Sequence, residues 1–291
     1  MRAYFSRSPF IIVNKYSPLI SMINYKRIIN AFSERLVATC LHVRYSLEGM
    51  LRARGIRRQF VDAPIIIGGC GRSGTTLLLS ILSAHPDIYA IPIETGSFIT
   101  REPRRLYPGL KMKLNYFYGT NFKNVPKIHR RWCEKTPSNV QHFDKLLDKF
   151  NGNVKLVHII RDGRDVTLST HPTDKSKYWV EPERWIHEVK KGLEYRNHDN
   201  VYTIKYEDII NNYDREIKSL CSFLDLKEID SIIDWHENTT VRSNRAWAGE
   251  VKPLFTGSVE KWRNPKYESR VKQFMQNEEA VELLMELDYQ V

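Results

Sequence analysis

A Gly-rich turn between an apolar strand and the start of a helix is the feature that most constrains this chain. Residues 63–78 read APIIIGGCGRSGTTLL. We expect a buried strand at 64–67 to lead into a loop whose backbone N–H groups and helix N-terminus hold an anion. Thr75 stands where nucleotide triphosphatases carry a lysine, and the cation is Arg72 instead. The loop therefore predicts a bound anion other than a magnesium-bound triphosphate.

A second apolar run leads to a cation and a hydroxyl. Residues 155–166 read KLVHIIRDGRDV, which predicts a strand ending just before Arg161 and a turn at Asp162 and Gly163. Arg161 would then lie at the sheet edge where open α/β folds bind ligands. Ser169 is expected about one turn into the next helix. A guanidinium and a hydroxyl together suit a phosphate dianion.

Strand and helix patterns alternate along the chain. We expect strands at 64–67, 88–91, 154–160 and 201–205, and helices at 74–84, 182–196 and 208–224. This alternation predicts an α/β fold with a single P-loop-like domain, in which helices cover a central parallel sheet.

An N-terminal helical extension is expected to precede that domain. Residues 1–60 are interpreted as an arm and a basic amphipathic helix, helical from about 21 to 58, where Gly55 is a candidate end. The main domain is expected to span 61–291. The aromatic and basic segment 101–131 is interpreted as an insertion over the active site.

Together the two anion-binding motifs resemble those of sulfotransferases that use 3′-phosphoadenosine-5′-phosphosulfate (PAPS). The stretch GRSGTTLL resembles the Arg-type loop of tyrosylprotein and many bacterial sulfotransferases. The resemblance implies that PAPS is the sulfuryl donor, that its desulfated form PAP is the product, and that no metal is needed. Two further stretches, YED at 206–208 and GSVEKWR at 257–263, resemble the family's nucleotide-contacting element and its closing loop. The implied cofactor-binding residues are Arg72, Ser73, Gly74, Thr75, Thr76, Arg161, Ser169, Tyr206 and Lys261.

Catalysis of sulfuryl transfer needs a base for the acceptor and cations for the leaving phosphate. By the same resemblance, Glu94 is the base, and Arg72 and Lys135 (in EKTPSN) are the cations. Aryl sulfotransferases use a histidine instead, which leaves three histidines as alternatives: His85, His129 and His158. Of these, His85 and His158 are expected to be structural, because one precedes a proline at a helix end and the other lies inside a strand.

Composition limits the partners. The chain has 45 Lys and Arg against 34 Asp and Glu, but it contains no recognisable nucleic-acid-binding module. We therefore expect a positive cleft for a polyanionic cofactor and no nucleic-acid partner. The basic N-terminal helix is a candidate for contact with an anionic membrane surface, but packing against the catalytic domain or against a second subunit, as in a homodimer, is favoured over it. The sequence has no run of 18 apolar residues, so no membrane span is predicted. Its four cysteines are widely separated, which suggests reduced thiols in the cytoplasm.

Two other functions stay open from the sequence. One is a P-loop kinase or nucleotide hydrolase, against which Thr75 stands. The other is a non-catalytic nucleotide-binding member of the same fold. If the chain is a sulfotransferase, its acceptor is expected to be a hydroxyl or amine of a small molecule, glycan or peptide. The sequence does not select among these acceptors.

Overall fold

Five short segments form one parallel sheet in the order β2–β3–β1–β4–β5. This is seen in a computed structural model that describes residues 18–98, 110–171, 174, 176–244, 249–250, 254 and 256–291. The strands are β1 Ile65–Gly68, β2 Ile88–Ala90, β3 Arg131–Lys135, β4 Lys155–Ile160 and β5 Val201–Lys205. The predicted α/β class with a central parallel sheet is confirmed.

The register brings the carboxyl ends of three strands to one edge. Ile67 of β1 pairs with Lys135 of β3 on one side and with Val157 of β4 on the other. The loop after β1, the end of β3 and Arg161 after β4 therefore emerge on the same side of the sheet, where open α/β folds bind ligands.

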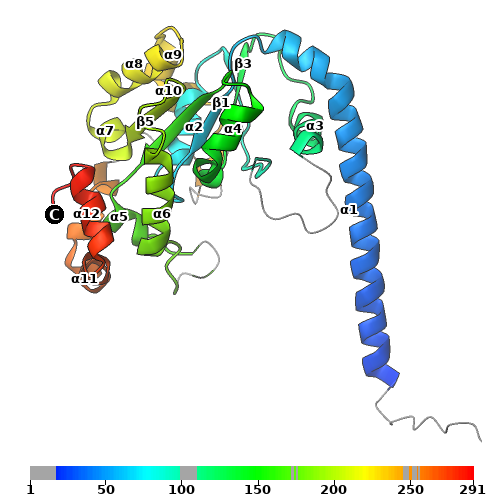
Figure 1. Ribbon diagram of the computed structural model, residues 1–291, viewed down its shortest axis with the longest axis horizontal. Coiled ribbons are helices and arrows are strands. Elements are labelled where there is room, and N and C mark those ends of the chain that lie inside the picture. The colour runs from blue at the N-terminus through cyan, green and yellow to red at the C-terminus, as the bar shows by residue number, and fades with distance from the viewer. Residues whose placement is uncertain are drawn as a thin grey trace, which may run out of the picture.

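Helices cover both faces of the sheet (Figure 1). They are α1 Pro18–Gln59, α2 Thr75–Leu82, α3 Leu110–Asn121, α4 Phe143–Lys149, α5 Gly163–Thr167, α6 Pro182–Leu193, α7 Tyr206–Asn211, α8 Tyr213–Phe223, α9 Asp230–Ile233, α10 Trp235–Asn238, α11 Glu268–Met275 and α12 Glu278–Glu286. Short 3₁₀ turns follow β3 and precede α11: η1 Pro137–His142, η2 Thr256–Ser258, η3 Lys261–Arg263 and η4 Pro265–Tyr267. Strands β6 Ser243–Asn244 and β7 Gly249–Glu250 form a separate antiparallel pair.

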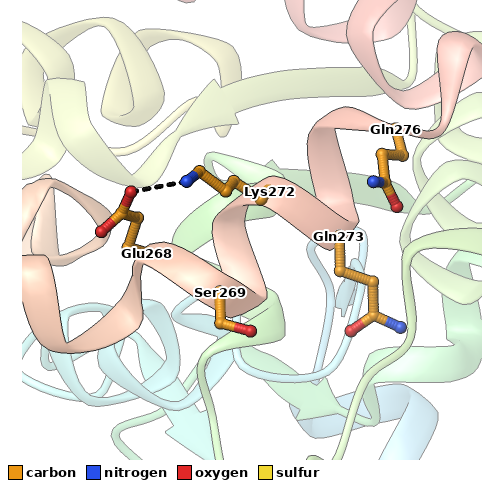
Figure 2. A pocket seen from close by; sticks show the side chains of 5 residues that line it. All are labelled: Glu268, Ser269, Lys272, Gln273 and Gln276. Carbon is orange, nitrogen blue, oxygen red and sulfur yellow. Dashed lines mark ion pairs between the residues drawn. The ribbon is translucent and has the colours of Figure 1, made fainter.

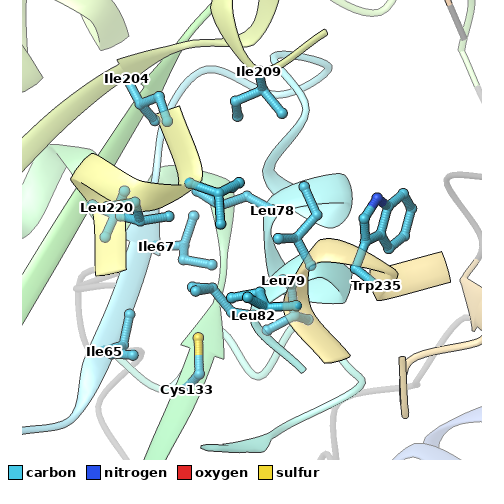
Figure 3. Packing of buried hydrophobic residues seen from close by; sticks show 14 of the residues in the cluster. Ile65, Ile67, Leu78, Leu79, Leu82, Cys133, Ile204, Ile209, Leu220 and Trp235 are labelled. Carbon is cyan, nitrogen blue, oxygen red and sulfur yellow. The ribbon is translucent and has the colours of Figure 1, made fainter. Parts of the chain in front are cut away.

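Alternation along β1 divides the core into two layers. Ile65 and Ile67 point to one face, where they pack with Leu78 of α2, Leu220 of α8 and Trp235 of α10 (Figure 3). Ile66 points to the other face and belongs to a second cluster. That cluster also includes residues of α1, α3, η1 and α4.

Three expectations about elements were wrong in detail. The N-terminal helix runs through Gly55 to Gln59. The helix expected at 208–224 is two helices, because Asn212 adopts φ −137° and ψ 45° between α7 and α8. The segment expected as an insertion contains α3 and leads directly into β3, a central strand that the sequence patterns did not reveal. Its residues 101–109, like arm residues 1–17, lie outside the described part.

His158 is a core residue of β4. Its ring is fully buried against α6, where a Cβ on Gly192 would lie 2.1 Å from it. Neither ring nitrogen has a hydrogen-bond partner among the described residues. Burial lowers the pKa of His158 to about 3, so the ring is held neutral. This environment is consistent with the structural role expected for it.

We predict that His158 makes the fold sensitive to acid. The unfolded state protonates this imidazole below about pH 6.5, whereas the folded state does so only near pH 3. As the pH is lowered from about 6.5 to about 3, the free energy of unfolding should therefore decrease, by at most about 1.4 kcal/mol per pH unit. In His158→Leu the pH slope should be shallower by up to one proton, as measured by urea unfolding at several pH values. His187→Leu, at an exposed site on α6, should keep the wild-type slope; equal slopes in all three proteins would contradict the prediction.

Candidate functional site

The loop between β1 and α2 forms an anion cradle at the sheet edge. Arg72 and Gly74 both adopt left-handed backbone conformations, with φ of 75° and 95°. A Cβ on Gly74 would lie 2.4 Å from the ring of Tyr206, so this position requires glycine. The Ser73 hydroxyl is buried with no hydrogen-bond partner in the described part of the chain. Thr75 and Thr76 follow as the buried first residues of α2.

Three predicted cations lie close enough to repel one another. Arg161 donates from Nη1 to the Arg72 carbonyl oxygen at 3.2 Å. Burial, and then the charge of Arg161, lowers the pKa of Arg72. The same two causes, in the same order, lower the pKa of Lys261. The Nε atoms of Arg72 and Arg161 are buried without partners among the described residues. Clustered positive charge with unused donors fits a site for an anion.

The segment around Lys261 is tied to this cluster. The Tyr206 ring packs 4.4 Å from the Arg161 guanidinium, and its hydroxyl lies 2.6 Å from the Ser258 hydroxyl. Arg161 also donates from Nη2 to the Ser258 carbonyl oxygen. The backbone N–H of Trp262 donates to the buried carboxylate of Asp165 at 3.0 Å. These contacts place Lys261 beside the loop although it is nearly 190 residues away in sequence.

A second group joins the cradle from β3 and from the loop after β2. The Lys135 side chain is fully buried, and its ammonium donates to Thr76 Oγ1 at 3.1 Å and to Glu94 Oε1 at 2.5 Å. The Glu94 side chain is 51% exposed. Glu94, Lys135 and Thr76 therefore meet at the start of α2, with one face of the Glu94 carboxylate open.

Glu134 holds this second group in place, and the sequence reasoning did not single it out. Its buried Oε1 accepts hydrogen bonds from the Thr95 backbone N–H (3.3 Å), the Thr95 hydroxyl (2.8 Å) and the Thr136 hydroxyl (2.6 Å). Its Oε2 accepts from Asn139 Nδ2 at 2.7 Å, and that amide also donates to the Ile67 carbonyl oxygen. Burial raises the pKa of Glu134 although these donors oppose the shift. The carboxylate thereby connects three elements: the Glu94 loop, β3 and β1.

Ser169 is not brought into the described contacts of Arg161. α5 ends at Thr167, so Ser169 lies beyond the helix and not one turn into it. Its N–H donates to the Val166 carbonyl oxygen, and its carbonyl oxygen accepts from Trp179 N–H at 2.8 Å. Ser169 remains half-buried near the end of α5.

The alternative histidines lie elsewhere. His129 is bonded to the Pro86 carbonyl oxygen just before β3 begins, whereas Lys135 ends that strand. The two residues are thus separated by roughly 20 Å of extended chain. His85 is buried and contacts the Lys227 carbonyl oxygen after α2. Neither histidine belongs to the group around Glu94.

Three further observations concern the surface hollow, metal binding and the membrane. The hollow in Figure 2 lies on α11 and contains an exposed Glu268–Lys272 ion pair of 2.7 Å, but none of the predicted site residues. Among the described residues, no three His, Cys, Asp or Glu side chains are grouped to hold a metal ion. In the same part of the chain, no helix is both long enough and apolar enough to cross a membrane.

Comparisons with known proteins agree on one family. A model of the sulfotransferase domain matches residues 62–278. An uncharacterized protein of Aquifex aeolicus is 23% identical over 233 residues, covering 69% of this chain and 30% of that protein. A putative protein-tyrosine sulfotransferase of Caenorhabditis briggsae is 27% identical over 197 residues, covering 60% of this chain and 69% of that protein.

A solved structure gives the same answer for the fold. The sulfotransferase domain of the Synechococcus PCC 7002 olefin synthase aligns with a TM-score of 0.51 and 18% identity, over 79% of this chain and 97% of that domain. This likeness is one of fold. The chain spans less than a third of the Aquifex aeolicus relative.

We predict that Glu134→Ala destabilises the protein. It leaves Thr95, Thr136 and Asn139 without their buried acceptor, which should lower the free energy of unfolding by on the order of 3 kcal/mol. Chemical denaturation measures this loss. Glu282→Ala, at an exposed site on α12, is the matched control and should change stability little. Equal stability of the two variants would show that the Glu134 network contributes nothing.

Proposed function

This chain belongs to the sulfotransferase domain family, and we propose that it transfers the sulfuryl group of PAPS to a hydroxyl or amine by in-line displacement. The observation that carries the proposal is the cluster of Arg72, Arg161 and Lys261, whose charges oppose one another and in which the buried Nε atoms of the two arginines are unused donors. Asp165, 3.5 Å from Arg161, offsets part of this positive charge, and a donor with phosphate groups at both ends of its nucleotide would offset the rest.

The cradle would hold the 5′ end of the donor. Its backbone N–H groups, the Ser73 hydroxyl and the α2 N-terminus suit a phosphosulfate. The full set proposed there is Arg72, Ser73, Gly74, Thr75 and Thr76. Arg72 and Lys135 would neutralise the charge that develops on the leaving phosphate.

The 3′-phosphate would lie against Arg161. Its unpartnered Nε is a donor available for a charge-assisted hydrogen bond. Lys261 would add a second cation, and the Tyr206 ring would keep the Arg161 guanidinium in position. Ser169 is proposed as a further phosphate contact, carried over from the resemblance of its motif.

Glu94 is proposed as the base. Lys135 occupies Oε1, which leaves Oε2 at the exposed side of the carboxylate to take the proton of an acceptor hydroxyl or amine. The proton moves to Glu94 as the acceptor atom bonds to sulfur and the bond from sulfur to the bridging oxygen breaks. No other titratable side chain among the described residues contacts Lys135.

The competing functions are less well supported. A P-loop kinase or nucleotide hydrolase needs a lysine in this loop, but this chain has Thr75 at that position, as the first residue of α2. A non-catalytic nucleotide binder would need the cradle and Arg161 but not an exposed carboxylate paired with a buried lysine. The Glu94–Lys135 pair therefore favours an enzyme.

Acceptor, assembly and location stay predictions from the sequence. The acceptor is a small molecule, a glycan or a peptide; a named relative is a putative protein-tyrosine sulfotransferase. Residues 99–109, part of the stretch expected to select the acceptor, lie outside the described residues. We retain a cytoplasmic location, a homodimer and membrane contact through α1 as proposals.

We predict that PAP raises the melting temperature without a divalent metal, because it binds the folded state alone. Arg161→Ala should raise the dissociation constant for PAP about tenfold or more, since it removes a charge-assisted contact. Calorimetric titration measures the constant. Arg196→Ala, at an exposed Arg paired with Glu286, is the control. A requirement for magnesium, or equal stabilisation by ATP, would refute the donor assignment; unchanged affinity in Arg161→Ala would remove that residue from the site.

We also predict that Glu94→Gln separates chemistry from binding. The amide keeps the shape of the carboxylate but cannot accept the acceptor's proton, so turnover should fall by about 10²–10⁴-fold. PAP affinity should stay within about twofold of wild type, because Glu94 is not placed against the nucleotide. Turnover with labelled PAPS and a panel of phenols, glycans, amines and tyrosine peptides provides the readout. Glu282→Gln is the control, and near-wild-type turnover in Glu94→Gln would return the role to a histidine.

A further inference from the structure

The outer side of α1 carries an apolar surface that nothing in the described chain covers. Seven residues form it, and we call it the outer apolar face: Val37, Cys40, Leu41, Val43, Leu47, Met50 and Leu51. Leu51 is 79% exposed and Val37 56%, although both are large apolar side chains. At about 100° per residue, the seven positions spread over roughly half of the helix circumference.

The opposite side of α1 is already occupied. α3 packs closely along it. A Cβ on Gly49 of α1 would lie 1.7 Å from the carbonyl oxygen of Asn115 in α3. A Cβ on Gly119 of α3 would lie 1.9 Å from the carbonyl oxygen of Tyr45 in α1. His42 stacks on Tyr116 with ring centroids 4.5 Å apart. Figure 1 shows α3 beside α1, while α1 extends well away from the sheet. The fold therefore uses the inner side of α1 and leaves the outer apolar face free.

Basic side chains accompany this face. Arg44, Arg54, Arg57 and Arg58 are all exposed along the same part of the helix. Between residues 37 and 59 the sequence contains one acid, Glu48. It is engaged by Arg44 at 2.9 Å, and by Arg52 and Lys123 at 3.6 Å each. The surface is thus apolar and positively charged together, and its occupant must be apolar and anionic.

A second copy of the chain does not satisfy that requirement. Pairing the same patch with itself would bring two sets of arginines together with a single, already engaged acid on each side. The apolar positions also cover a wider arc than the narrow seam of a coiled coil. By the same rotation Arg44 lies within the apolar arc, and Arg54 and Arg58 continue it toward the end of the helix. A helix with such a face can lie in a lipid interface, because the aliphatic part of each Arg passes among apolar groups while its guanidinium reaches the headgroups.

We propose that the outer apolar face of α1 docks onto an anionic lipid surface. The helix lies along the interface with the apolar residues among the acyl chains. Arg54, Arg57 and Arg58 reach the anionic headgroups. α3 and the catalytic domain stay on the aqueous side, because they pack against the opposite side of the helix. This inference is independent of the proposed sulfuryl transfer.

Vesicle flotation of the full chain tests the proposal. The wild type should float with phosphatidylcholine vesicles that contain about one quarter phosphatidylglycerol, float much less with phosphatidylcholine alone, and detach as salt is raised. Leu47→Glu with Leu51→Glu should weaken binding at least about tenfold, because carboxylates replace the inserted side chains. Arg54→Glu with Arg58→Glu should abolish the preference for anionic vesicles.

A matched control separates position from charge. Met285→Glu with Ile233→Glu introduces the same charges at apolar sites on α12 and α9, which are 55% and 49% exposed. This variant should float like the wild type. PAP should stabilise all variants equally, which shows that they are folded and keeps this test separate from that of the donor site.

Three results would overturn the proposal. The first is equal flotation of the wild type with neutral and anionic vesicles. The second is equal loss of flotation in the control variant. The third is light scattering that shows a dimer in the absence of lipid which the Leu47 and Leu51 double variant converts to a monomer, because a second copy would then be the occupant.

Discussion

The backbone hydrogen bonds that pair β1 in parallel with both β3 and β4 determine where the site's charges lie. Ile67 is matched with Lys135 and Val157 in this register, so the three chains leave the sheet at one edge. A shift of one residue in β3 would turn Lys135 to the opposite face of the strand. It would then no longer reach Thr76 and Glu94, which it contacts at 3.1 and 2.5 Å.

Two halves of this edge differ in how their charges are satisfied. Around β3, the buried carboxylate of Glu134 receives hydrogen bonds from three residues, and Lys135 has Glu94 as its counter-ion. Around Arg161, burial and the charge of Arg161 lower the pKa of Arg72 and of Lys261, and the Nε atoms of Arg72 and Arg161 have no partner in the described chain. The first half is therefore complete without a ligand. The second half holds three cations against the carboxylate of Asp165, which lies 3.5 Å from Arg161, so a bound anion would add balancing charge there. Such a division suits a site in which binding and chemistry are done by different groups.

The parts predicted from sequence are those encoded locally. Four of the five strands were predicted from sequence, and the apolar runs before Gly69 and before Arg161 also located the cradle. β3 was missed because Arg131, Glu134 and Lys135 make it look like a polar turn, although all three are buried in the sheet. Its charges are tolerated only because partners from other elements satisfy them, such as the Leu224 carbonyl oxygen at Arg131. Glu134 could not be singled out for the same reason: Thr95 and the Asn139 amide reach it through the topology, not through sequence spacing.

The Glu94–Lys135 pair connects the two charges that change during the proposed transfer. In the free protein the Lys135 ammonium is buried and has the Glu94 carboxylate as its counter-ion. If Glu94 takes the acceptor's proton, that counter-ion is neutralised just as negative charge grows on the oxygen leaving sulfur. The Lys135 ammonium, still hydrogen-bonded to Thr76 at the start of α2, would then be free to stabilise the negative charge on the leaving phosphate. Proton removal at one end of the reaction would thus strengthen charge stabilisation at the other, because one buried lysine faces both.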